Sequence, residues 1–288
     1  MKLNTTIKTL CGAVAIAAST FASATPFYLN VGVDYDPIGT NQVTPTSTSV
    51  KSEAQYKYKS TTNIFDVDNS GNVNVGDLVS TNIGLTAIGG TWGNSRVTGF
   101  DPSQLGPFDS DNGYSTNYLI GMRATGLQGM VTGVSGLGAP LISYGPGVIE
   151  MLISFDFGTT FKNFMDLKIT AGGPSLLGTV LFGSVDFTNV DPAYNNLFNT
   201  TGQTCNGATG YYDIWKNCGN NAMPITFEAS QDTNVLIGSF VNIGNGVFQA
   251  TTNHDGSVAF NVPEPASLAL LGAGLFGLGA ARRRKIAA

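Results

Sequence analysis

Through the interior of the chain, apolar and polar residues alternate with a period of two, and turn residues interrupt the alternation. Residues 148–157 show this pattern most strongly, and Gly158 ends it. Such alternation is typical of β-strands that have one buried face. We predict strands at residues 27–35, 56–64, 78–88, 118–131, 148–157, 164–170, 179–187, 235–243, 247–252 and 257–262.

Glycine-rich turns are expected to connect several of these strands. Residues 172–174 separate two of them, and residues 244–246 and 253–256 are expected to join the last three strands as hairpins. Between the two terminal segments we find no sustained helical pattern of apolar residues. Short strands without intervening helices predict an all-β fold, an antiparallel β-sandwich or jelly roll, in one domain of about 240 residues.

The first 24 residues have the three parts of a secretory signal peptide. Lys2 and Lys8 precede an apolar stretch at residues 10–18, and the small residues of the triplet 22–24 form a cleavage site for signal peptidase. We therefore predict that residues 1–24 are removed and that the mature chain begins at Thr25. An ordinary N-terminal helix is the alternative.

The C-terminal segment has a tripeptide, an apolar stretch and a basic cluster in succession. Pro263, Glu264 and Pro265 cannot continue a strand or helix, because proline lacks an N–H and restricts the residue before it. The 16 residues from 266 to 281 are uncharged. As a helix they would span about 24 Å, slightly less than a membrane's hydrocarbon core. The basic residues would hold the end in the cytoplasm as a stop signal; they are Arg282, Arg283, Arg284 and Lys285. A buried core helix is the alternative.

This arrangement resembles the PEP-CTERM sorting signal of bacteria that produce exopolysaccharide. The resemblance covers residues 262–285 and implies that an exosortase recognises the tripeptide. It further implies a precursor held transiently in the inner membrane, and then release to the cell surface or extracellular matrix. The whole layout is similar to flocculation-associated PEP-CTERM proteins, which implies exopolysaccharide as a partner and a role in biofilm or floc formation. The expected organisation is a signal peptide (1–24), a β-rich ectodomain (25–261) and a sorting segment (262–288).

The predicted ectodomain is acidic, although the whole chain has a formal charge of only −5. Six of the 14 basic residues lie near the two ends of the chain, which leaves 8 basic residues between Thr25 and Pro265 against all 19 acidic ones, a net charge of −11 for that span. This charge excludes a basic nucleic-acid-binding protein. It would also repel anionic polysaccharide unless divalent cations mediate the contact. The alternative is that the acidity only keeps the protein soluble.

Two cysteines remain after Cys11 is removed with the signal peptide. Cys205 and Cys218 are an even pair in an oxidising compartment, which predicts a disulfide between them. The bond would stabilise the fold by about 3 kcal/mol, because it restricts the unfolded chain. Two free thiols or an intermolecular bond are the alternatives.

Residues 66–77 match the pattern of a twelve-residue calcium-binding loop. Side-chain oxygens stand at positions 1, 3, 5, 9 and 12, glycine stands at the sharp turn of position 6, and position 7 would offer its backbone carbonyl. The predicted calcium ligands are Asp66, Asp68, Ser70, Asn72, Asn74 and Asp77.

The last ligand of this loop departs from the helix-loop-helix pattern, which has Glu at position 12. Asp77 followed by Leu78 resembles the loops of cellulosomal dockerins instead. Dockerins carry two such loops with helices, so a cohesin-binding dockerin is not favoured. A solvated turn without metal is the alternative. Asp109 and Asp111 form a weaker second candidate, for which a plain turn is the favoured interpretation.

We predict that the chain is not an enzyme. Its single histidine, His254, falls in a predicted turn, and the mature cysteines are expected to be oxidised. A zinc site would need three or four His or Cys ligands. A glycosidase needs two carboxylates, and Glu150, Asp156 and Glu228 are candidates, although we expect them to face solvent.

Aromatic residues offer the alternative function. Trp92, Trp215, Tyr211 and Tyr212 could stack on sugar rings, although packing in the core is the favoured interpretation for each tryptophan. The predicted function is therefore an exported non-enzymatic surface or matrix protein; the alternative is a carbohydrate-binding, lectin-like module that recognises a defined glycan.

Overall fold

The computed structural model describes residues 24–87, 89–101, 109–175, 178–202, 207–218, 224–232 and 235–262. Its strands are β1 (Phe27–Leu29), β2 (Glu53–Phe65), β3 (Leu78–Gly84), β4 (Arg96–Asp101), β5 (Leu119–Val134), β6 (Pro140–Tyr144), β7 (Gly147–Ser154), β8 (Lys162–Pro174), β9 (Gly178–Asp186), β10 (Phe198–Thr200), β11 (Thr226–Asp232), β12 (Val241–Gly244) and β13 (Val247–Asn261). The helices are η1 (Trp92–Asn94), η2 (Pro192–Tyr194), α2 (Tyr211–Cys218) and η4 (Ile237–Ser239).

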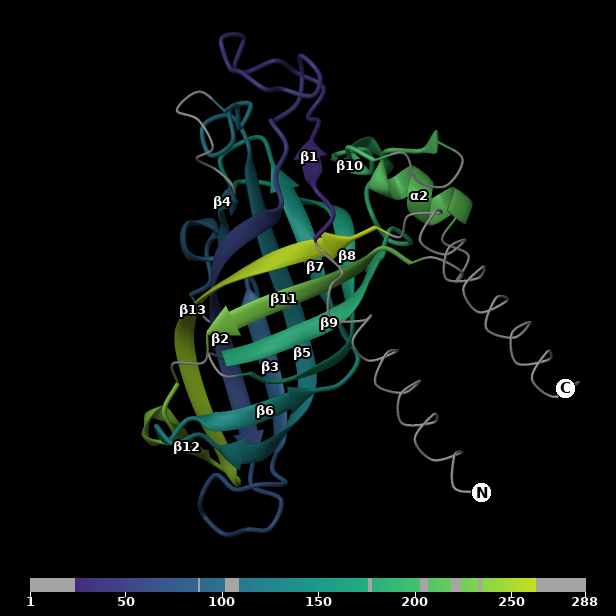
Figure 1. Cartoon of the computed structure of the whole chain (residues 1–288). Helices are drawn as coiled ribbons and strands as arrows, with labels where there is room; N and C mark the ends of the chain where they lie inside the picture. Colours follow the sequence, from purple (N-terminus) through teal and green to yellow (C-terminus); the bar gives the residue numbers. More distant parts are fainter. Residues whose placement is uncertain are drawn as a thin grey trace, which may run out of the picture.

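Eleven of the strands form an antiparallel, barrel-like sheet of eight strand positions, which we call the ring, and β1 and β10 pair in a separate two-stranded sheet (Figure 1). Three of the positions are shared by two successive strands, because β3 and β4 both pair with β2, β6 and β7 both pair with β5, and β11 and β12 both pair with β13. The sheet closes where β13 pairs with β2, from Val247 opposite Phe65 to Val258 opposite Ala54. Apart from this closure, neighbouring positions of the ring follow one another in the sequence, with β10 inserted between β9 and β11.

The β-rich prediction is confirmed, but the sandwich or jelly-roll detail is not. Long strands pair with different partners along their length, as when β13 pairs with β2 and also with β11. This pairing joins the main strands into a single sheet, and closure covers most of its edges. In the described part of the chain, the short strand β12 pairs with β13 alone and keeps one open edge. A two-sheet sandwich and a closed ring bury one face of each strand in the same alternating way, so periodicity alone does not distinguish them.

Two predicted turns lie inside strands instead. Residues 253–256 belong to β13, and Gly172 and Gly173 belong to β8. Gly256 is needed for close packing, since a Cβ there would lie 2.1 Å from the Ser230 carbonyl oxygen and 2.7 Å from the Tyr56 ring. The glycine therefore marks a close approach between neighbouring strands rather than a bend in the chain.

Helix α2 was not expected from the sequence. Tyr211, Ile214 and Cys218 are buried on one face of it, and Trp215 packs partly buried beside them. These four residues do have helical spacing, but the pattern lasts only two turns within a glycine-rich stretch.

The core fills the ring and continues into an aromatic cluster at one end. There β1, β10 and α2 pack against the ring (Figure 1). Phe198 stacks on Phe27 with ring centroids 5.2 Å apart and packs edge-on to Phe260 at 5.6 Å. Tyr211 of α2 contacts Phe260 at 5.6 Å. The ring and its core are thus complete within the described residues.

The predicted signal peptide up to residue 23 and the sorting segment from residue 263 lie outside the described residues. In the part of the chain that is described, no helix is long and apolar enough to cross a membrane.

Candidate functional site

The predicted calcium loop connects β2 to β3 at the end of the ring opposite β1 and α2 (Figure 1). Neighbouring strands hold it in place. The Asp66 backbone N–H donates to the Gly246 carbonyl (2.8 Å) in the β12–β13 turn, and the Gly76 N–H donates to the Val131 carbonyl (2.8 Å) of β5. Both ends of the loop are therefore anchored to the sheet.

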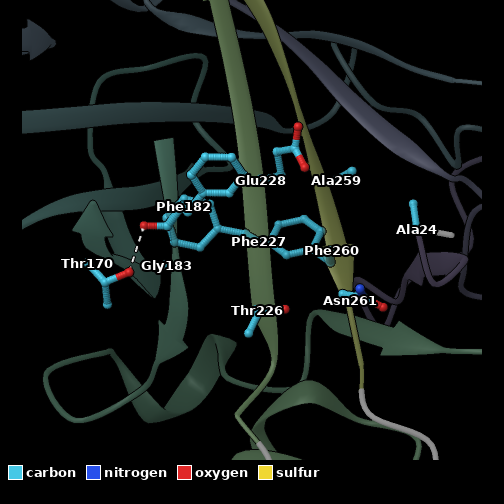
Figure 2. A pocket seen from close by; sticks show the side chains of 10 residues that line it. All are labelled: Ala24, Thr170, Phe182, Gly183, Thr226, Phe227, Glu228, Ala259, Phe260 and Asn261. Carbon is cyan, nitrogen blue, oxygen red and sulfur yellow. Dashed lines mark hydrogen bonds between the residues drawn. The ribbon is translucent and has the colours of Figure 1, made fainter. Parts of the chain in front are cut away.

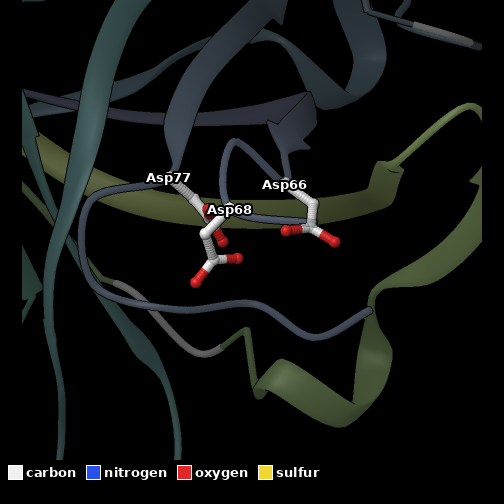
Figure 3. Close-up of side chains that lie close together, drawn as sticks. All are labelled: Asp66, Asp68 and Asp77. Carbon is white, nitrogen blue, oxygen red and sulfur yellow. The ribbon is translucent and has the colours of Figure 1, made fainter. Parts of the chain in front are cut away.

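The structure brings the three carboxylates of the loop together (Figure 3). Asp66, Asp68 and Asp77 each offer an oxygen, and these oxygens lie within 4.8 Å of one another. Calcium–oxygen bonds are about 2.4 Å long, so two oxygens bound to one ion are at most about 4.8 Å apart. The spacing of the carboxylates therefore fits a single calcium ion.

Hydrogen bonds to the first two carboxylates turn the loop back on itself. The Asp66 carboxylate accepts from the N–H groups of Ser70 (3.0 Å) and Gly71 (2.8 Å), and Asp68 accepts from the Ser70 N–H (3.0 Å). Gly71 has a φ of +76°, a conformation that glycine adopts without strain. The sharp turn predicted at position 6 is thus present.

The polar residues between the aspartates join the same network. The Ser70 hydroxyl donates to the Asn72 carbonyl (3.2 Å), and the Asn74 side-chain amide donates to the Ser70 Oγ (2.5 Å) and more weakly to Asp68 (3.5 Å). All six predicted ligand residues therefore lie in one hydrogen-bonded loop, with Asp77 attached to it through the backbone of Asn74 (2.7 Å).

Asp77 is the most confined of the carboxylates, with 1% of its surface exposed. Its two oxygens accept from the N–H groups of Val67 (3.2 Å) and Asn74 (2.7 Å). Among the described residues, no Lys or Arg forms an ion pair with Asp66, Asp68 or Asp77. A buried charge is costly unless it is paired, and a divalent cation would pair it.

Hydrogen bonds with the Asp66 carboxyl group and with Ser70 lower the pKa of Asp68. These hydrogen bonds favour the charged form of Asp68. Hard oxygen donors around concentrated negative charge suit Ca²⁺.

The second acidic candidate has other partners. Asp111 forms an ion pair with Lys51, which is fully buried, and Asp109 accepts a hydrogen bond from the Asn41 side chain (2.5 Å). These contacts favour a structural turn at 109–113, as the sequence indicated.

The expected position of His254 in a turn is wrong, because the residue lies within β13 and its side chain is buried. Its Nε2 contacts the hydroxyls of Ser60 and Thr252, both at 2.8 Å, and its Nδ1 contacts the Asp232 carbonyl oxygen at 3.0 Å. Burial lowers the pKa of His254. Residues 253–256 have the composition of a turn, which explains why the sequence predicted one here.

Ser60, His254 and Asp232 have the order of a catalytic triad, with the Asp232 carboxylate 3.4 Å from Nδ1. However, Ser60 is 2% exposed and borders an interior cavity of about 40 Å³. Such a volume holds only a few water molecules. The cavity is therefore too small for a substrate beside the hydroxyl.

The candidate glycosidase carboxylates have separate surroundings. Glu150 of β7 pairs with Arg123 of β5 at 2.6 Å. Asp156 holds the β7–β8 turn, and hydrogen bonds from Thr160 and Ser154 lower the pKa of Asp156 to about 2. Glu228 is exposed on β11. The first two carboxylates therefore have structural partners.

A groove of about 640 Å³ lies on β9, β11 and β13 (Figure 2). Phe182, Phe227 and Glu228 line it, and Ala24 and Asn261 border it. The first and last described residues are close here, because the Thr25 N–H donates to the Phe260 carbonyl (2.8 Å) and the Val262 N–H to the Thr25 Oγ1 (3.0 Å). The predicted signal-cleavage site and the start of the sorting segment are thus neighbours in space.

The aromatic candidates divide into buried and partly exposed residues. Tyr211 is buried in the core, whereas Tyr212 and Trp215 are partly exposed on α2 and stack with centroids 5.9 Å apart. Trp92 is also partly exposed and lies under the Arg96 guanidinium at 5.3 Å.

Cys218 ends α2 and is buried. Cys205 lies outside the described residues, so the disulfide stays a prediction.

The PEP-CTERM protein-sorting motif matches residues 261–285 in a comparison with protein-family models. The match contains the predicted tripeptide and the basic cluster, both outside the described residues. Comparison with curated proteins finds no match, and neither does comparison with solved structures. The motif indicates an exported, membrane-anchored precursor that an exosortase sorts to the surface, and it supports the prediction of a PEP-CTERM protein.

Proposed function

We propose that this protein is a non-enzymatic component of the extracellular matrix, associated with exopolysaccharide in biofilms or flocs. The sorting motif is the observation that supports this most directly, since exosortase sorting sends the ectodomain out of the cell. The span from Thr25 to Pro265, with 8 basic and 19 acidic residues, needs divalent cations to approach an anionic polysaccharide.

The surroundings of the polar side chains support a non-enzymatic role. The single histidine is packed inside the ring, next to a cavity of about 40 Å³ that has room for only a few water molecules. Glu150 and Asp156 are engaged with Arg123 and with the β7–β8 turn. We interpret these contacts as structural, because they hold strands and a turn in place, rather than as parts of a catalytic site.

We further propose that the loop at residues 66–77 binds one calcium ion. The convergence of three carboxylates within 4.8 Å supports the site. Asp77 is buried, so a bound ion would supply the positive charge that pairs with its carboxylate. When bound, the ion would neutralise the carboxylates and stabilise the connection between β2 and β3.

A lectin-like module is the second candidate, favoured by the stacked pair Tyr212 and Trp215 on α2. Aromatic faces suit the C–H faces of sugar rings. A glycan array separates the two functions, because a lectin binds one sugar saturably, whereas a matrix component shows broad, weak retention or none.

The test of the main proposal replaces Pro263, Glu264 and Pro265 with alanine in the producing cell. We expect the variant to stay anchored in the inner membrane and the cells to aggregate as poorly as a deletion strain. Ser267→Ala, just outside the tripeptide, is the control and should be sorted normally. A triple variant found outside the cell at wild-type size contradicts the sorting step. Normal aggregation of the deletion strain contradicts the matrix role.

A further inference from the structure

A short stretch of chain separates the ring from the membrane in the anchored precursor. β13 ends at Asn261, Val262 is buried, and the uncharged stretch of the sorting segment begins at Ala266. The four Cα–Cα steps from Val262 to Ala266 reach at most about 14 Å, even when fully extended. The headgroup layer on each side of a bilayer is about 5–8 Å thick. Anchoring through the uncharged stretch therefore brings the face of the ring around Val262 to the membrane surface.

The first described residues lie at the same face. The Thr25 N–H donates to the Phe260 carbonyl (2.8 Å), and the Val262 N–H donates to the Thr25 Oγ1 (3.0 Å). The predicted signal peptide, which directly precedes Thr25, would therefore also lead to the membrane from this face. Both predicted membrane segments thus impose the same orientation on the ring.

Helix α2 lies beside this point and presents aromatic side chains (Figure 1). Tyr211 packs against Phe260 of β13 with ring centroids 5.6 Å apart. Tyr212 and Trp215 are partly exposed, and the ammonium of the exposed Lys216 lies 5.6 Å from the Tyr212 ring. We call these last three residues the α2 face. Tyr and Trp gather at membrane–water interfaces, because each joins an apolar ring to a polar group, and a neighbouring Lys can extend to the headgroups.

The chain around the α2 face is neutral. Residues 192–227 carry Asp213 and Lys216 as their only charges, and residues 24–33 carry none. The span from Thr25 to Pro265, by contrast, has a net charge of −11, so the acidic residues lie mainly on other segments. We therefore expect this face to contact lipid through its aromatic rings rather than through attraction to anionic headgroups.

We propose that the α2 face rests on the non-cytoplasmic surface of the inner membrane in the anchored precursor, with Tyr212 and Trp215 at the level of the headgroups. The contact would fix the orientation of the ring while the exosortase acts. It rests on the anchoring step of the proposed function and goes beyond that function, because it names a lipid surface as the partner of α2. A glycan is the competing occupant of the same rings.

Quenching of tryptophan fluorescence tests the contact. Residues 25–288 are reconstituted in phosphatidylcholine vesicles whose acyl chains carry bromine, a short-range quencher of tryptophan, and in matched vesicles without bromine. Trp92→Phe leaves Trp215 as the only tryptophan. We expect a strong loss of Trp215 emission, greatest when the bromines lie near the headgroups. Phosphatidylglycerol added to the vesicles should change this loss little, because the contact does not depend on charge.

The matched control moves the single tryptophan to the opposite end of the ring. It combines Trp92→Phe and Trp215→Phe with Leu137→Trp, because Leu137 is 87% exposed between β5 and β6, near the calcium loop. Bromine should quench this tryptophan several-fold less than Trp215. Equal quenching at both positions overturns the proposal, and so does the absence of quenching at Trp215.

Flotation of the same vesicles separates the contact from the anchoring. A chain that does not float with the lipid contradicts the anchored precursor, and the proposed contact is then wrong as well. A chain that floats without quenching of Trp215 overturns the contact alone and leaves the sorting step intact. A saturable change of Trp215 emission with one glycan, without quenching by brominated lipid, also overturns the contact and favours a lectin.

Discussion

Calcium should stabilise the ectodomain through the loop at residues 66–77, and Asp66→Ala should abolish the effect. Asp66 is the first ligand of the loop, and its carboxylate also accepts from the N–H groups of Ser70 and Gly71. Removing it takes away one of the three converging carboxylates. It also frees two exposed N–H groups, which water can satisfy, so the metal-free fold should lose only about 1 kcal/mol.

The size of the effect follows from mass action. Calcium at about 100 times its dissociation constant adds about 2.7 kcal/mol to the free energy of unfolding. For a domain of this size, 1 kcal/mol shifts Tm by about 2–4 °C. The wild-type ectodomain should therefore melt about 5–10 °C higher in calcium, and the Asp66→Ala variant should melt at the same temperature in both buffers.

Differential scanning calorimetry of residues 25–262 in EDTA and then in millimolar calcium measures the shift. Glu228→Ala is the control, because Glu228 is an exposed carboxylate on β11, and this variant should keep the full shift. Asp111 is unsuitable as a control, because it pairs with the buried Lys51. Identical wild-type melting curves in both buffers would show that the loop is an ordinary polar turn.

Three further predictions concern the predicted disulfide, an ion pair and the buried histidine. Mass spectrometry of a non-reduced digest should show Cys205 and Cys218 in joined peptides, and recovery of both as free thiols would refute the bond. Asp111→Asn should destabilise the fold by about 3–5 kcal/mol in urea unfolding, because it leaves the fully buried ammonium of Lys51 unpaired; Lys51→Met should cost less, and the reverse order would contradict this account. Burial holds the pKa of His254 below its ordinary value of 6.5, so the unfolded chain takes up the proton first and stability should fall from pH 7 to 5.5. His254→Gln should remove that part of the pH dependence, and an unchanged slope would exclude the histidine as its source.

Local features of the sequence were enough to predict much of the molecule. The period-two pattern located most of the long strands, since burial of one face of a strand is a local property. The sorting motif is a continuous segment, and its match confirms the prediction. The six calcium candidates also lie within twelve residues, so their convergence needs only the turn at Gly71 and anchoring of the loop ends.

Features that join distant parts of the chain were decided only by the tertiary structure. Closure of the ring pairs β13 with β2 across more than half the sequence, and alternation carries no information about which strands become neighbours. The same closure places His254 opposite Tyr58 inside the ring, although its neighbours in the sequence have turn chemistry. Gly256 is a packing glycine only because Ser230 and Tyr56 approach it from the two adjacent strands. The anchoring of the loop at residues 66–77 arises in the same way, because closure of the sheet brings the β12–β13 turn to the loop, where the Gly246 carbonyl accepts from the Asp66 N–H.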